Sequence, residues 1–155
     1  MFASSRLRGE FLMLTIVEKV LLLQNIELFS LVTSEQLSFL AAIAGEIEVA
    51  PSHILYREND VPDGLYVVIS GAVAMRRGDH QIDRVGPNGS FGVWALFDDE
   101  PRLTTAETLE PSRLLFVQRD EFYEVLSDHV DIVSGLFKQL VGRLRRLATV
   151  AETTP

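Results

Sequence analysis

After Gly45 the hydrophobic pattern of the chain changes from helical spacing to a series of short runs rich in valine, isoleucine and tyrosine. The runs are EIEVA, HILYR, LYVVIS, AVAMRR and QIDRV, followed later by TTAETLE and RLLFVQ. Sequences with glycine, proline, asparagine or aspartate separate them, and glycine supplies the positive φ that several tight turns need. Short strands at this spacing predict an antiparallel β-roll, jelly-roll-like (a double-stranded β-helix), over residues 46–118.

Helical patterns flank this roll, so the predicted fold class is α+β. Residues 11–24 suit a helix, and Thr33 with Gln36 forms a capping-box pattern for a second helix that ends near Gly45. We therefore expect N-terminal helices over 11–45 and, where the helical period returns, C-terminal helices over 119–148.

The last predicted helix carries apolar residues at alternating steps of three and four. They are Val130, Val133, Phe137, Leu140, Leu144 and Leu147. This a/d seam can lie along the roll as core or pair with a second copy of the chain. Gly135 and Gly142 weaken an isolated helix, and they also permit the close approach of a partner. The seam favours a homodimer through this helix.

The ends and the composition set broad limits. Residues 1–10 are expected to form a flexible tail and 149–155 a frayed tail around one domain spanning 11–148. The chain has 155 residues, with 14 Lys and Arg against 22 Asp and Glu, a net charge of −8. An acidic balance argues against general nucleic-acid binding but leaves room for one local anion site.

Targeting and redox signals are few. The chain has no cysteine, which excludes disulfides and thiolate metal sites and fits a cytoplasmic location. The apolar stretch at 11–23 is interrupted by Glu18 and Lys19, so it is too short and too charged to span a membrane. It also lacks the cleavage site of a signal peptide.

The stretch FGVWALFDDEPRLTT, residues 91–105, differs from the hairpin-like connections around it. Gly92 and the apolar residues after it predict a short helical turn, whose first N–H groups have no partner within the turn and can bind an anion. Arg102, placed by Pro101, would supply a planar fork that grips two phosphate oxygens. The alternative is a surface arginine that pairs with Asp99 or Glu100.

A longer segment around this stretch, GPNGSFGVWALFDDEPRLTTAETLE, resembles the phosphate-binding cassette of the cyclic nucleotide-binding domain family. That family includes bacterial catabolite activator regulators, regulatory subunits of protein kinase A and cyclic nucleotide-gated channels. DVPDGLYVVISGAV, with Asp63, Tyr66 and Gly71, resembles the family's glycine-containing strand pair, and the resemblance covers about residues 25–147.

The resemblance implies a regulatory sensor domain. It would hold cAMP, cGMP or a related anion in the roll and relay binding to the C-terminal helices. The residues expected to contact the ligand are Gly89, Phe91, Gly92, Val93, Trp94, Ala95, Arg102, Thr104 and Thr105. Of the two threonines, one can point at the ligand beside Arg102, because alternate strand residues share a face, or both are ordinary strand residues.

The cassette departs from the family at Val93. The family usually has a glutamate there, which accepts a hydrogen bond from the ribose 2′-hydroxyl. Losing such a bond costs about 1.5–3 kcal/mol, or on the order of 10- to 100-fold in affinity. The site then binds a cyclic nucleotide weakly or takes another phosphate or carboxylate. Alternatively the pocket is silent, Arg102 is paired internally with an acid, and the domain serves dimerisation or docking.

Other chemistries have weaker support. His53, His80 and His129 are isolated in the sequence, which argues against a metal-dependent cupin enzyme. No nucleophile motif is present, so we expect neither an enzyme nor a bound cofactor or metal. No recognition helix follows the last predicted helix, so we do not expect this chain alone to read DNA.

Overall fold

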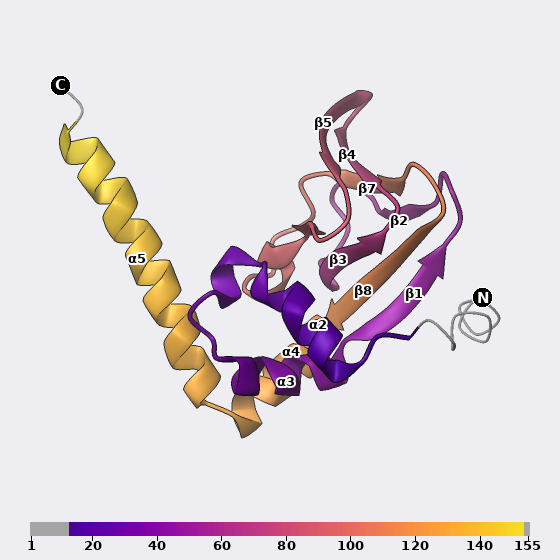
Figure 1. Ribbon diagram of the computed structural model, residues 1–155. Helices are drawn as coiled ribbons and strands as arrows, with labels where there is room; N and C mark the ends of the chain where they lie inside the picture. The colour runs from indigo at the N-terminus through magenta and orange to yellow at the C-terminus, as the bar shows by residue number, and fades with distance from the viewer. Residues whose placement is uncertain (1–12, 154–155) are drawn as a thin grey trace.

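The computed structural model describes residues 13–153, which form a β-roll with helices at one end and a long helix that leads away from it (Figure 1). The strands are β1 (Gly45–Val49), β2 (Ile54–Tyr56), β3 (Gly64–Ser70), β4 (Val73–Arg77), β5 (His80–Val85), β6 (Ser90–Phe91), β7 (Thr105–Thr108) and β8 (Ser112–Gln118). The helices are α2 (Ile16–Gln24), η2 (Glu27–Phe29), α3 (Ser34–Ile43), η3 (Val93–Leu96), α4 (Arg119–Asp128) and α5 (Asp131–Thr153).

The strands form two antiparallel four-stranded sheets, which confirms the predicted roll. One sheet has the order β1-β8-β3-β6 and the other β2-β7-β4-β5. Each of the seven apolar runs becomes a strand, with bounds that differ from the prediction by one or two residues at most ends. The two-residue strand β6 was not predicted. It places Phe91 opposite Tyr66 of β3, whereas Phe91 was expected to open the irregular stretch.

Strand β3 divides the apolar interior into two parts. Leu65 and Val67 face the helices, together with Leu115 and Val117 of β8. Tyr66 and Val68 face the inside of the roll, where aromatic side chains gather. Successive side chains of a strand point to opposite faces, so one strand serves both cores. The inside of the roll is therefore packed with aromatic side chains.

Side-chain caps define where the first helices begin. The Thr33 hydroxyl accepts from the Gln36 N–H and the Gln36 side chain accepts from the Thr33 N–H, as the capping-box pattern predicts. Thr15 and Glu18 form the same arrangement at the start of α2. The helix predicted from residue 11 therefore begins at Ile16. Residues 11 and 12 lie outside the described part of the chain, as does the tail expected at 1–10.

Helix α5 is longer than predicted. It continues to Thr153, so residues 149–153 are helical rather than frayed. Two uses were left open for the predicted seam, and most of the seam does not pack along the roll. Phe137, Leu144 and Leu147 are exposed, whereas Leu140 packs against the core. The helix buries Ile132, Leu136 and Gln139 against the domain.

Gly135 explains how closely α5 approaches the domain. A Cβ atom at this position would lie 2.8 Å from the carbonyl oxygen of Leu31, just after η2. Gln139 is the next anchor, and its side-chain oxygen accepts from the Ser30 hydroxyl at 3.0 Å. Gly135 therefore serves packing within the chain.

Among the described residues, no helix is both long enough and apolar enough to cross a bilayer.

Candidate ligand-binding site

A glycine-led turn connects β6 to the rest of the cassette, as the sequence predicts. Gly92 adopts a left-handed conformation (φ 79°, ψ 18°), which glycine reaches without steric cost. The next four residues form the 3-10 helix η3. The Ala95 N–H, which we expected to face a ligand, donates instead to the Gly92 carbonyl at 3.1 Å. One backbone N–H group of the turn is therefore already hydrogen-bonded within the turn.

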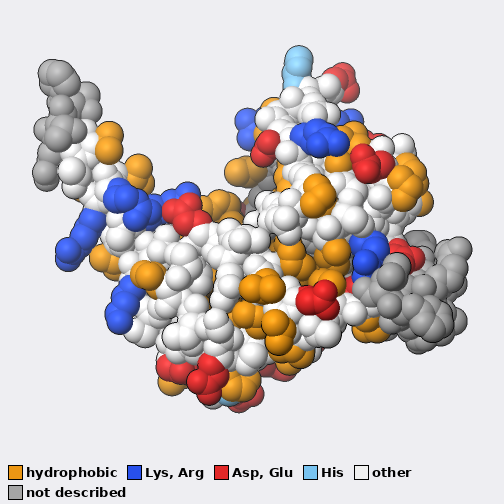
Figure 2. All heavy atoms as spheres, in the orientation of Figure 1, with side chains coloured by type: hydrophobic (Ala, Val, Ile, Leu, Met, Phe, Trp, Pro, Cys, Tyr) orange, Lys and Arg blue, Asp and Glu red, His pale blue; other side chains and the backbone are white. Residues whose placement is uncertain are grey.

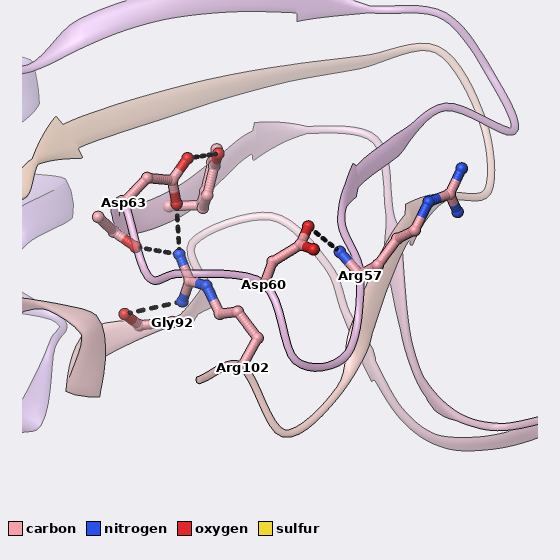
Figure 3. Close-up of polar contacts among 7 residues, drawn as sticks. Arg57, Asp60, Asp63, Gly92 and Arg102 are labelled. Atoms are coloured by element: carbon pink, nitrogen blue, oxygen red, sulfur yellow. Dashed lines mark hydrogen bonds and ion pairs between the residues drawn. The ribbon is translucent and has the colours of Figure 1, made fainter. Parts of the chain in front are cut away.

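The backbone of Arg102 is fixed to the loop between β2 and β3. Its N–H donates to the carbonyl of Asp60 at 2.9 Å, and its carbonyl accepts from the N–H of Asn59 at 2.8 Å. Asp60 in turn accepts from the Arg57 N–H through its carboxylate at 2.9 Å (Figure 3). These bonds hold two segments together that lie far apart in the sequence, and they place the Arg102 side chain inside the molecule.

The Arg102 guanidinium is buried and points toward the start of β3 (Figure 3). Its Nη2 donates to Asp63 Oδ1 at 2.6 Å and to the Gly64 carbonyl at 2.8 Å. Its Nη1 lies 3.5 Å from the Gly92 carbonyl. The Tyr56 ring lies beneath the guanidinium, 3.9 Å from its Cζ to the ring centroid. Arg102 is thus paired internally with an acid, and that acid is neither Asp99 nor Glu100.

The pairing of Arg102 is incomplete. Its Nε is buried and has no hydrogen-bond partner among the described residues. A guanidinium carries five donors, and buried polar groups normally find partners. The guanidinium to which this donor belongs also lines a cavity.

Asp63 connects Arg102 to Tyr66. The Tyr66 hydroxyl donates to Asp63 Oδ2 at 3.2 Å, on the carboxylate that Arg102 already contacts. Burial, followed by the nearby Asp63 charge, raises the pKa of Tyr66 above its ordinary value. Burial also raises the pKa of Tyr56, against the opposing charge of Arg102. Both phenols are therefore neutral at physiological pH, and Tyr66 donates to Asp63.

A cavity of about 600 Å³ opens beside this arginine. Five of the predicted site residues line it, namely Gly92, Trp94, Ala95, Arg102 and Thr104. Of the two threonines, Thr104 is therefore the one at the cavity. Lining residues that were not expected to contact a ligand include Tyr56, Asn59, Met75, Arg77, Asp98 and Glu100. The volume is sufficient for a small organic ligand.

Four predicted site residues have other positions. Gly89 forms a turn against β3, where its carbonyl accepts from the Val68 N–H at 2.8 Å. Phe91 lies in the aromatic interior, stacked on Tyr66 with a centroid separation of 5.1 Å. Val93 packs against the apolar core between the helices and the roll. The Thr105 hydroxyl accepts from the Glu58 N–H at 3.1 Å. None of these four residues is among the lining residues of the cavity.

The acidic segment after η3 has two environments. Asp98 and Glu100 line the cavity and are exposed, and the Asp98 carboxylate accepts from the Glu100 N–H at 3.1 Å. Asp99 forms an ion pair with Arg119 at the start of α4. Two carboxylates at the rim oppose the charge of an anionic ligand. No cluster of three His, Asp or Glu side chains suited to a metal ion occurs within residues 13–153.

The roll, the glycine-led turn and the buried arginine beside a cavity define the chain as a β-roll domain with a candidate small-ligand site. Residues 46–129, more than half of the chain, match the family described as "Cyclic nucleotide-binding domain". The chain belongs to this family, as the cassette sequence led us to expect.

Similar proteins are regulators. A CRP-like cAMP-activated global transcriptional regulator of Mycobacterium tuberculosis is 30% identical over 105 residues, covering 64% of this chain and 47% of that protein. A cAMP-dependent protein kinase type II regulatory subunit of Drosophila melanogaster is 29% identical over 124 residues, covering 80% and 33%. The chain thus spans about half or less of the length of these relatives.

A solved structure shows the same fold. The N-terminal domain of a transcriptional regulator from Streptomyces coelicolor superposes with a TM-score of 0.76 at 29% identity, covering 81% of this chain and 94% of that one. A cyclic nucleotide-binding-like protein from Brucella abortus gives 0.64 at 28% identity, covering 70% and 97%. This similarity extends over most of the described residues.

Proposed function

We propose that this chain is a regulatory sensor domain that binds a phosphate-bearing ligand of the cyclic nucleotide type. The observation that carries the proposal is the buried Arg102 guanidinium at the wall of the cavity, with its Nε unpartnered. A phosphate oxygen would add the charge-assisted hydrogen bonds that the guanidinium lacks. Similarity to regulators named for cAMP supports the same ligand class.

The ligand would share Arg102 with Asp63. The carboxylate of Asp63 already occupies Nη2, so the phosphate would approach the remaining donors beside Gly92. A Cβ atom at Gly92 would lie 2.6 Å from Arg102 Nη1. Because Gly92 has no side chain, both the arginine and a ligand have room to approach the backbone of the turn.

Val93 weakens the affinity of the proposed site for a ribose-containing ligand. Its side chain packs into the apolar core, so this position offers no acceptor to a 2′-hydroxyl. The rim carboxylates of Asp98 and Glu100 add repulsion. We therefore expect weak binding of cyclic nucleotides, on the order of 10- to 100-fold below a site with glutamate at this position.

Isothermal titration with cAMP and cGMP up to millimolar concentration tests the proposal. Saturable heat in the wild type, lost in Arg102→Ala, is the expected result. Arg57→Ala is the matched control, since Arg57 is exposed, is absent from the cavity lining and contributes its backbone N–H to the loop. Binding that survives Arg102→Ala would contradict the assigned role of the arginine.

A second candidate is a binding-silent module used for dimerisation or docking. The Arg102–Asp63 pair favours it, because the internal acid already neutralises the arginine. The absence of heat with either nucleotide, together with an unchanged melting temperature, would support this candidate over the first.

Helix α5 would carry the output in both cases, as a homodimer contact. Its exposed apolar side chains include Phe137, Val141, Leu144 and Leu147, which would be buried between two copies. Analytical ultracentrifugation should show a dimer that Leu144→Glu converts to monomer. Ile82→Glu is the control, because Ile82 is an exposed apolar residue on β5. A monomer at every concentration would remove the dimer proposal.

A further inference from the structure

Asn59, in the loop between β2 and β3, has an unusual backbone conformation beside the cavity. Its φ is 71°, in the left-handed region that non-glycine residues seldom adopt. Ser52 and Asn88 are the other non-glycine residues with positive φ in the described part of the chain. Of these three, Asn59 alone is among the lining residues of the cavity. The chain thus places a side chain at the cavity in a conformation that glycine would reach more easily.

Hydrogen bonds fix the backbone of Asn59 but not its side chain. Its N–H donates to the Arg102 carbonyl at 2.8 Å, and the Asp60 N–H closes the turn on the Arg57 carbonyl at 3.1 Å. Asparagine is tolerated at such a turn position, and its side chain often hydrogen-bonds to nearby backbone. Here the side-chain amide makes no hydrogen bond within residues 13–153. The turn therefore accounts for the backbone of Asn59, and the carboxamide remains available to a ligand.

Exposure separates Asn59 from the Arg102 guanidinium along the depth of the cavity. A backbone hydrogen bond joins the two residues, but Arg102 is 6% exposed whereas Asn59 is exposed. Trp94 and Leu103 also line the cavity, and both are exposed apolar residues. A flat aromatic ring packs well on such side chains. A ligand whose phosphate meets Arg102 would therefore place an aromatic base toward Trp94, Leu103 and the Asn59 carboxamide.

We propose that the Asn59 carboxamide binds the edge of the ligand's base and makes the site prefer adenine to guanine. The inference rests on the proposed function, since it needs a nucleotide whose phosphate lies at Arg102. A carboxamide presents an acceptor and a donor side by side, and adenine presents the matching N6 donor and N7 acceptor. Guanine presents two acceptors, O6 and N7, on the same edge. The Asn59 oxygen would then face O6, so that repulsion replaces one of the two hydrogen bonds.

Arg77 is the alternative base contact, because an arginine matches the two acceptors of guanine. It lines the cavity from the end of β4 and is exposed. Figure 2 shows Lys and Arg side chains gathered over β4 and β5, where Arg76 and Arg84 form ion pairs with acids of a neighbouring segment. Arg77 forms no ion pair within the described residues. Its long side chain would therefore lose more conformational freedom on binding than the short side chain of Asn59, so we assign the base contact to Asn59.

Asn59→Gly tests the contact without straining the turn, since glycine adopts positive φ at no steric cost. Calorimetry of the wild type should give a dissociation constant for cAMP about five- to tenfold below that for cGMP. This factor is near the lower end of what one amide–adenine pair contributes, because Asn59 is exposed. Asn59→Gly should raise the constant for cAMP by a similar factor and leave that for cGMP nearly unchanged. The two nucleotides should then bind about equally.

Asn88→Gly is the matched control. Asn88 has the same φ of 71° but does not line the cavity. This variant should keep both dissociation constants of the wild type, and the melting temperatures of both glycine variants should stay close to that of the wild type.

An analogue of cAMP in which carbon replaces N7 separates a direct contact from a change in the loop. The wild type should bind this analogue about fivefold more weakly than cAMP, since one hydrogen bond is lost. Asn59→Gly should bind the analogue and cAMP equally, because the effects of removing two groups that contact each other are not additive.

The outcomes separate this inference from the proposed function. Saturable heat with the same dissociation constant for cAMP in the wild type and Asn59→Gly would overturn the base contact and leave the proposed function in place. A preference for cGMP that Arg77→Gln abolishes would have the same consequence. Equal losses in Asn59→Gly and Asn88→Gly would also overturn the contact, since they would indicate a general effect of glycine in the loops. No heat in the wild type at millimolar nucleotide would overturn both proposals together.

Discussion

Arg102 and Asp63 form an ion pair in which one partner is buried and the other is half exposed. Arg102 Nη2 lies 2.6 Å from Asp63 Oδ1, with side-chain exposures of 5% and 50%. The buried cation depends on this acid for neutralisation, whereas the acid is also solvated by water. Removing the acid should therefore be costly, and supplying another anion should reverse part of the cost.

Asp63→Asn should lower the free energy of unfolding by about 1–3 kcal/mol. Breaking a fully buried pair costs about 3–5 kcal/mol, and the exposure of Asp63 reduces this figure. Phosphate or cAMP should then raise the melting temperature more in the variant than in the wild type, because the ligand replaces the lost charge. The control is Asp60→Asn, which keeps an acceptor for the Arg57 N–H. Equal shifts in all three proteins would show that Arg102 does not receive the anion.

Gly92→Ala should be more destabilising than Gly78→Ala. Both glycines have positive φ, at 79° and 60°, so both substitutions carry a backbone cost of about 1–2 kcal/mol. Only at Gly92 would the new Cβ also meet the Arg102 guanidinium, whereas nothing lies within 4 Å at Gly78. Urea denaturation of the two variants isolates the contact from the backbone strain. Equal losses would indicate that Arg102 moves aside freely.

Two glycines of α5 should respond in opposite directions to alanine. Gly142→Ala should stabilise the protein by about 0.5–1 kcal/mol, since alanine favours the helix and the new Cβ meets nothing closer than 3.7 Å. Gly135→Ala should destabilise it, because the Cβ would lie 2.8 Å from the Leu31 carbonyl oxygen. Thermal denaturation compares them. A stabilised Gly135→Ala would mean that α5 does not pack on Leu31 in solution.

Stability should fall at alkaline pH through Tyr66. Its pKa is raised in the folded protein, first by burial and then by Asp63. Such a group contributes stability that is fully present below the unfolded pKa, about 10, and is lost as pH rises above that value. The free energy of unfolding, measured between pH 9 and 11, should therefore decline. Tyr66→Phe should decline less steeply, while Tyr56 continues to contribute. Identical slopes would contradict the role of Tyr66.

Local sequence patterns predicted the strands, the helix caps and the glycine-led turn because these are decided by neighbouring residues. The capping box at Thr33 and the left-handed Gly92 are examples. The partner of Arg102 was missed, since Asp99 and Glu100 are near in sequence but Asp63 is brought close by the loop before β3. The resemblance to the family identified Asp63 as a matching residue but did not predict its contact with Arg102.

Local sequence patterns also could not predict which residues of η3 face the cavity. Val93 turns into the core, while Trp94 and Ala95 face the cavity. That rotation depends on how the turn packs against β3 and α4. Likewise, the apolar periodicity of α5 identified a seam but not the face that meets the domain, because Gly135 and Gln139 decide that face through contacts with η2 and the residues after it.

Because β1 pairs with β8, the first sheet cannot close during synthesis until the last strand has been made. The first strand finds its hydrogen-bonding partner in the last one, and β2 likewise waits for β7. A nascent chain that has emerged only as far as β5 has the β4–β5 hairpin but no closed sheet. Closure over such long separations is slow compared with hairpin formation. We therefore expect the sensor cavity to appear only after residue 118 has left the ribosome, late and all at once.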